Sequence, residues 1–84
     1  MTLEEYRRAE EKRLEINIKH MENGVRFVDI NTAYIGGEVS IGEGTLIGPC
    51  VILEGKTEIG ADCVILQNTR IVDSVIEDHV EIQS

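Results

Sequence analysis

The sequence is poor in the residues that usually reinforce a small fold: its 84 positions include no tryptophan, one phenylalanine, one proline and two cysteines. A chain of this length forms one small domain and buries only about 60% of its unfolded surface, so self-association is expected. Cys50 and Cys63 lack CxxC spacing and a nearby histidine pair. They therefore predict neither a zinc site nor a disulfide, and two reduced thiols are expected.

The sequence also lacks a signal-peptide pattern and an apolar run long enough to cross a membrane, which favours a cytoplasmic protein. Basic residues are scarce: the chain has eight of them and sixteen acidic residues, which gives a net charge of −8. From residue 24 onward only Arg26, Lys56 and Arg70 are basic. This composition argues against nucleic acid or anionic lipid as a partner, since phosphates require clustered Lys and Arg.

Residues 1–23 are predicted to form a helix of the linker type. Thr2 and Glu5 make a capping box at its start, and Asn23-Gly24 provides the glycine that commonly follows a helix end. Apolar residues share one face only in the second half, so we expect the helix to dock there and to leave its start loosely held. The expected docking residues are Leu14, Ile18 and Met21.

A six-residue period dominates the rest of the chain, and it fits neither an α-helix nor a single strand. A small or β-branched residue follows four positions after each repeated aliphatic, and glycine follows directly after four of them as an expected turn residue. Three such sides close one coil of about 18 residues in a hexapeptide β-helix. The repeated aliphatics are Ile35, Ile41, Ile47, Leu53, Ile59, Ile65 and Ile71, and the small residues are Val39, Thr45, Val51, Thr57, Cys63, Thr69 and Val75.

The expected organisation is thus the helix at 1–23, a connecting strand and loop at 24–34, and about 2.8 β-helical coils at 35–84. The aliphatics should form columns, with Ile35, Leu53 and Ile71 on one side of the prism. Near the end the period slips, because Ile76 and Ile82 come one residue early. One turn there is expected to be short by a residue, which a solenoid tolerates because each coil contacts only its neighbours.

Four segments resemble the domain junction of the bacterial bifunctional N-acetylglucosamine-1-phosphate uridyltransferase/glucosamine-1-phosphate N-acetyltransferase family. They are HMENGV (20–25), TAYI (32–35), LEGKTEIG (53–60) and RIVDSVIEDHVEI (70–82). The resemblance implies a helical arm that leads into a left-handed parallel β-helix, which trimerises in that family. It also implies a cytoplasmic role in UDP-N-acetylglucosamine synthesis for the cell wall. The chain departs from the family pattern at Ile30, Leu66 and Glu77.

The resembled enzymes use acetyl-CoA and Mg, but the sequence motifs for both of their active sites have no counterpart here. We therefore assign no catalytic, cofactor-binding or metal-binding residue in this chain. His79 is the one histidine of the repeat region and falls at an outward or turn position, where a solvated side chain is expected rather than a catalytic base. His20 near the helix end is expected to be structural.

The remaining candidates also favour ordinary roles. Cys63 falls in the inward small-residue column, and Cys50 at an outward position beside acidic residues that disfavour a thiolate. Lys56 and Arg70 are the only cations of the repeats, which is too few for the phosphates of coenzyme A. The glycine-rich stretch 36–48 has no phosphate-loop pattern.

The leading hypothesis is a short homologue or fragment of the resembled enzyme that acts as a structural and oligomerisation module without an active site. Two alternatives stay open. The chain could assemble with a full-length homologous enzyme and modulate it, or it could be a minimal acyltransferase whose sites form between subunits. The expected partner in the leading hypothesis is the chain itself, with a trimer favoured.

Overall fold

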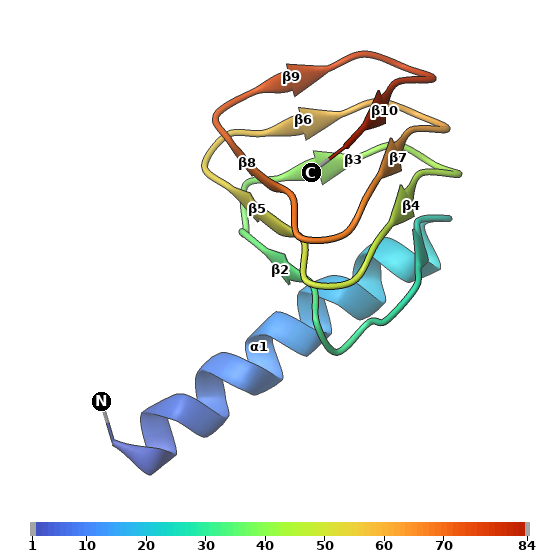
Figure 1. Cartoon of the computed structure of the whole chain (residues 1–84). Coiled ribbons are helices and arrows are strands. Elements are labelled where there is room, and N and C mark those ends of the chain that lie inside the picture. Colours follow the sequence, from blue (N-terminus) through green and yellow to red (C-terminus); the bar gives the residue numbers. More distant parts are fainter. Residues whose placement is uncertain (1, 84) are drawn as a thin grey trace.

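A computed structural model describes residues 2–83, which form one helix followed by ten short strands (Figure 1). Helix α1 spans Leu3–Glu22, and Thr2 caps it by accepting a hydrogen bond from the backbone N–H of Glu5 at 3.1 Å, as predicted. The strands are β1 (Arg26–Phe27), β2 (Tyr34–Ile35), β3 (Ser40–Ile41), β4 (Leu46–Ile47), β5 (Ile52–Glu54), β6 (Glu58–Ile59), β7 (Val64–Ile65), β8 (Arg70–Val72), β9 (Val75–Ile76) and β10 (Glu81–Ile82).

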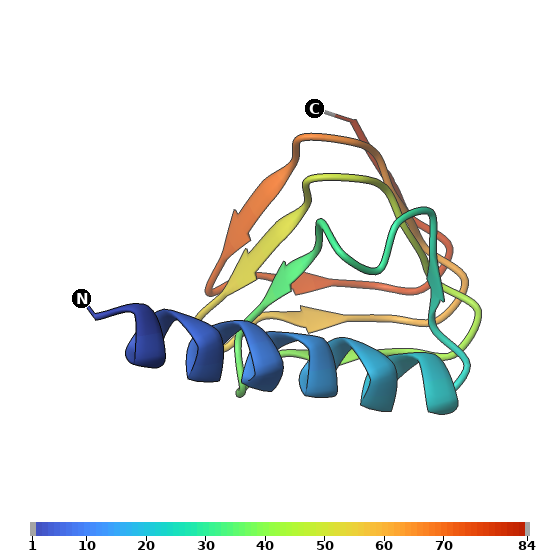
Figure 2. The same cartoon turned by 90° about the horizontal axis from the view of Figure 1, so that it is seen from below.

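The strands belong to three parallel sheets that form the sides of a triangular prism (Figure 2). One sheet has the order β1-β4-β7-β10, the second β2-β5-β8 and the third β3-β6-β9. Consecutive strands of the chain lie in different sheets, so the backbone winds around the prism and each strand pairs with the strand one coil away. The predicted fold class is confirmed: a single N-terminal helix is followed by a parallel β-solenoid of about three turns.

The pairing register confirms the predicted slip. Ile35 pairs with Leu53 and Ile59 pairs with Ile76, so the second pair is closer in sequence than the first by one position. The missing residue lies in the corner between β8 and β9, because the β5–β8 ladder still keeps the longer spacing. The strand ladders beyond this corner continue in the shifted register, which is possible because each coil packs only on its neighbours.

The core consists of the inward aliphatic columns and the smaller residues beside them. Leu53, Ile47 and Ile65 are completely buried. Phe27 of β1 pairs with Ile47 and extends the column of Ile47 and Ile65 toward the N-terminal end of the prism. Six of the seven predicted small inward residues are buried: Val39, Thr45, Val51, Thr57, Cys63 and Thr69.

The prediction for the seventh inward residue, Val75, is wrong, because its side chain is 68% exposed. The short corner moves the chain by one position, so that Ser74 lies above Thr57 and donates its backbone N–H to the threonine hydroxyl at 3.4 Å. Val75 then follows on the outward side of β9. A shift of one residue exchanges the inward and outward faces of a strand, and this explains the error.

The glycines that follow the aliphatics were predicted to be turn residues, but their physical role is to let neighbouring coils approach closely. A Cβ at Gly42 would lie 2.5 Å from the backbone nitrogen of Ala61 in the next coil, so this glycine permits close stacking of the coils. The left-handed backbone conformation occurs at other corner residues, most of which carry side chains. Outside glycine these are Cys50, Asp62, Asn68, Asp73 and His79, with φ between 47° and 60°.

Helix α1 lies across the N-terminal end of the prism, and its first half extends beyond the coils (Figures 1 and 2). Docking through the second half was predicted, but two of the three predicted docking residues are wrong. Leu14 is half-buried, whereas Ile18 and Met21 are 44% and 46% exposed. The polar Asn17 is completely buried instead. The reason is the polar loop at the end of the prism, whose carbonyl groups require hydrogen-bond donors. Between residues 2 and 83, no helix has the length and hydropathy of a membrane span.

Candidate functional site

The most elaborate group of polar contacts joins α1 to the loop that enters the first coil. The side-chain amide of Asn17 donates to the carbonyl oxygen of Ile30 at 2.9 Å and to that of Ala33 at 3.0 Å. Arg13, one turn earlier, donates to the same Ala33 carbonyl at 2.9 Å. Side-chain donors of α1 therefore satisfy carbonyls of a loop that lies outside the strands, and they fix the helix against the prism.

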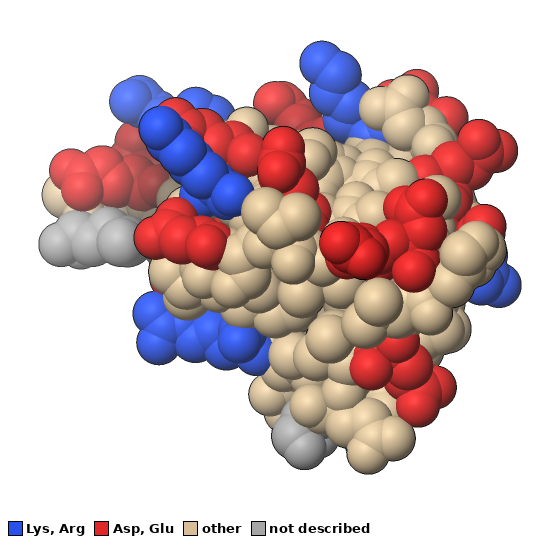
Figure 3. Space-filling model, turned by 90° about the horizontal axis from the view of Figure 1, so that it is seen from above, with Lys and Arg blue, Asp and Glu red and all other residues tan. Residues whose placement is uncertain are grey.

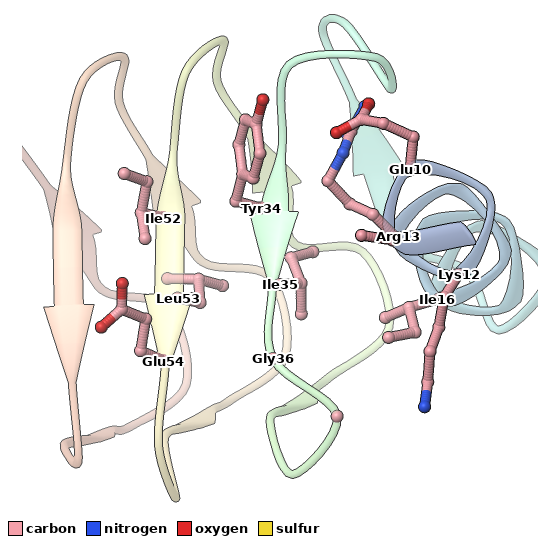
Figure 4. A pocket seen from close by; sticks show the side chains of 12 residues that line it. Glu10, Lys12, Arg13, Ile16, Tyr34, Ile35, Gly36, Ile52, Leu53 and Glu54 are labelled. Atoms are coloured by element: carbon pink, nitrogen blue, oxygen red, sulfur yellow. The ribbon is translucent and has the colours of Figure 1, made fainter. Parts of the chain in front are cut away.

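Arg13 also connects α1 to the outer face of β2 (Figure 4). Its guanidinium forms an ion pair with Glu10 at 2.7 Å and lies 4.6 Å from the centroid of the Tyr34 ring. The hydrogen bond to Glu10 raises the pKa of Arg13, so its charge is secure. An apolar groove of about 420 Å³ lies beside this group and is lined in part by Ile16 and Leu53.

His20 lies near the end of α1 and is half-buried against the first coil. Burial lowers the pKa of its imidazole below the usual value, because the neutral form is easier to desolvate. Its position at the contact between helix and coil is consistent with the structural role that the sequence predicts.

The lowered pKa of His20 predicts that acidification destabilises the protein. In the unfolded chain the His20 imidazole has the ordinary histidine pKa of about 6.5. In the folded chain its pKa is lower, so the unfolded chain binds the proton first as the pH drops. The free energy of unfolding should therefore fall as the pH drops from about 7 toward the folded pKa of His20. Thermal unfolding followed at pH 7.5, 6.5 and 5.5 measures the effect. His20→Gln should flatten this part of the profile and His79→Gln should not; equal profiles for all three proteins would contradict the prediction.

The other sequence candidates do not converge on a common site. His79 is exposed at a corner with φ of 60°, the outward or turn position that was predicted. Cys63 is completely buried and its thiol donates to the carbonyl oxygen of Glu77 at 3.0 Å, while Cys50 is exposed at another corner. Both thiols are free in the structure.

The two cations of the repeat region face different carboxylates. Arg70 forms an ion pair with Glu54 at 3.0 Å, and Lys56 lines a groove with Glu38 and Glu58. Among residues 2–83, no three acidic, histidine or cysteine side chains gather in a metal-binding arrangement. Lys56 and Arg70 therefore do not make a joint site for the coenzyme A phosphates, and the described carboxylates do not make one for magnesium, the groups that the family resemblance implies.

The end of the prism opposite α1 is acidic at its margin (Figure 3). Acidic side chains are spread over this surface among uncharged ones. Val72 and Val75, on the outward faces of β8 and β9 in the last coil, are 44% and 68% exposed. Exposed apolar side chains of this kind are a potential contact surface for another chain.

Curated bacterial proteins are similar in sequence to most of this helix-and-solenoid chain. It is 58% identical over 69 residues to the bifunctional protein GlmU of Clostridium botulinum, and 55% identical over 69 residues to that of Clostridium beijerinckii. The chain matches one segment of bacterial GlmU. This confirms the resemblance indicated by the sequence motifs.

The GlmU match covers most of this chain but little of its relatives. The aligned segment is 82% of the chain and 15% of the Clostridium botulinum protein. In Clostridioides difficile the match extends over 81 residues at 48% identity, which is 95% of the chain and 18% of the GlmU protein. No protein-family profile matches the chain.

The GlmU-like coils could be identified from the sequence, but the contacts of Arg13 and Asn17 could not. Both residues look like polar interruptions of an apolar helix face, and the pairing of a helix with a distant loop leaves no periodic signal. An asparagine in the second half of the helix would predict a contact with loop carbonyls only if the position of the loop beside the helix were already known.

Proposed function

We propose that this GlmU-like chain is a structural and self-associating module without an active site of its own. The observation that supports the proposal is the buried core of repeat residues, against which hydrogen bonds from Arg13 and Asn17 hold α1. Outward side chains of the sheets, such as Tyr34 of β2 and Val75 of β9, are 50% and 68% exposed and are available for contact between copies. By the family resemblance, the setting is cytoplasmic UDP-N-acetylglucosamine synthesis and the assembly is a trimer.

Light scattering coupled to gel filtration, over a tenfold range of concentration, tests this proposal. We expect a particle of about three times the 9.4 kDa chain mass, stable to dilution. A monomer at every concentration would refute self-association. An assay of acetyl transfer from acetyl-CoA to glucosamine 1-phosphate is the matching test of the active-site statement, and measurable turnover would contradict it.

A second candidate function rests on Val72 and Val75, which are exposed on the outward faces of β8 and β9 in the last coil. Through this surface the chain would bind a full-length homologous enzyme and modulate its assembly. Co-purification with full-length GlmU from the same cell is the test, with Val75→Lys as the variant and Val28→Lys, at an exposed position just after β1 in the first coil, as the matched control. Binding that Val75→Lys abolishes, and Val28→Lys leaves unchanged, would favour this role.

A further inference from the structure

A groove separates the second half of α1 from strand β3 and the corner before it. Its volume is about 630 Å³, and we call it the α1–β3 groove. Aliphatic side chains of Ile16, Val39 and Ile41 line its apolar part. Its polar part comes from α1 and consists of the cations Lys12 and Lys19 and the imidazole of His20, whose pKa burial lowers.

The charge of this groove is the opposite of the charge of the protein. The chain has a net charge of −8, yet none of the described residues that line the α1–β3 groove is a carboxylate. Two other grooves on the described part of the chain each contain two carboxylates, from Glu10 and Glu54 in one and from Glu38 and Glu58 in the other. An anion approaching this protein therefore finds in the α1–β3 groove a concave surface where the local charge is favourable.

The lysines of the groove have no ion-pair partner among residues 2–83. The ion pairs among these residues involve Arg8, Arg13 and Arg70. Lys12 extends on the far side of Ile16 from the Arg13–Glu10 pair, away from that carboxylate (Figure 4). A free ammonium group beside aliphatic side chains retains its full capacity to bind an anionic group.

The spacing of the lysines indicates an elongated ligand. Lys12 and Lys19 are separated by two turns of α1, which places them on the same side of the helix at about 10 Å along its axis. Ile16 lies between them on the groove wall. A single inorganic phosphate contacts one end of this arrangement, whereas a ligand with an aliphatic portion also covers Ile16, Val39 and Ile41.

We propose that the α1–β3 groove binds an organic anion that carries an aliphatic chain, with a phosphate or carboxylate head group. The head group contacts Lys12 or Lys19, and the chain lies over the aliphatic wall. The amide of Asn23, which also lines the groove, is a further hydrogen-bond donor for the head group. Ser40 marks the opposite edge of the groove, where it also borders Glu38 and Glu58. This binding role is separate from the structural function proposed above.

Titration with octyl phosphate tests the site directly, because the chain has two histidines in very different positions. In proton NMR, the imidazole signals of His20 should shift and its pKa should rise when the phosphate binds nearby, since an anion stabilises the imidazolium. His79 is exposed at a corner of the last coil and should not respond. Equal shifts of both histidines would overturn the proposal in favour of nonspecific association.

Two charge variants with the same net charge separate local from general electrostatics. K12Q/K19Q should weaken octyl phosphate binding at least tenfold, whereas R26Q/R70Q, which also removes two cations and leaves the groove lining intact, should change it less than twofold. Because Ser40 is exposed, S40E should fold normally and should also abolish binding. Unchanged affinity in both groove variants would refute the site.

Two further ligands identify what the groove recognises. Octyl glucoside has the same chain without charge, and binding as tight as that of octyl phosphate would refute recognition of an anion. Vesicles of anionic phospholipid test the alternative source of the same chemistry. Binding to vesicles without binding of monomeric octyl phosphate would overturn the groove in favour of a membrane-surface role of α1.

Discussion

Replacing Gly42 by alanine is expected to destabilise the protein by about 3 kcal/mol, the upper end of the usual cost of overpacking. The new methyl carbon would lie 2.5 Å from the backbone nitrogen of Ala61 and 2.6 Å from the carbonyl carbon of Gly60. These are backbone atoms of the next coil, so no side-chain rotation relieves the overlap. The ladder between β3 and β6 would have to open, and thermal or urea unfolding should show a fall in the melting temperature of about 12–24 °C.

Gly37 provides the matched control for this substitution. A Cβ at Gly37 meets no atom within 4 Å, and its φ lies outside the left-handed region. Gly37→Ala should therefore leave stability unchanged or raise it by up to about 1 kcal/mol through the lower entropy of the unfolded chain. Similar losses in the two variants would show that coil spacing is not what Gly42 provides.

The β-solenoid could be predicted from the sequence because each coil repeats one local pattern. Ile35, Leu53 and Ile71 contact equivalent positions of neighbouring coils, so a period of six specifies both the strand faces and the pairing. The same logic located the short turn, since Ile76 arrives one residue early. The outward position of Val75 was missed, because the small-residue column was extended past the turn without the shift.

The helix and the candidate sites depend on contacts between distant segments, and these leave no repeat. Hydrophobicity favours Ile18 and Met21 as the docked face of α1, but the prism presents loop carbonyls at its end, and Asn17 is the residue that can satisfy them. Similarly, the α1–β3 groove is cationic because none of the sixteen acidic residues of the chain lines it. Linear spacing carries no such information.

The second large effect is expected for Asn17→Ala, which should destabilise the protein by about 2 kcal/mol. The substitution removes the hydrogen bonds to the carbonyl oxygens of Ile30 and Ala33 and leaves the Ile30 carbonyl without its side-chain donor. The loss is partly offset, because the Ala33 carbonyl keeps Arg13 and because the side-chain oxygen of Asn17 is itself buried without a partner among the described residues. Urea unfolding monitored by circular dichroism measures the change.

Ile18→Ala is the control for this prediction, since Ile18 is the next residue of α1 but is 44% exposed. Its cost should be about 0.5 kcal/mol or less, as for most substitutions away from the core. If Asn17 anchors α1 to the prism, hydrogen exchange in Asn17→Ala should accelerate in α1 more than in β4 and β7, because the helix can detach while the central ladder remains paired. Uniform acceleration in all elements would mean instead that the helix and the coils unfold as one unit. The cap formed by α1 would then be inseparable from the fold that it closes.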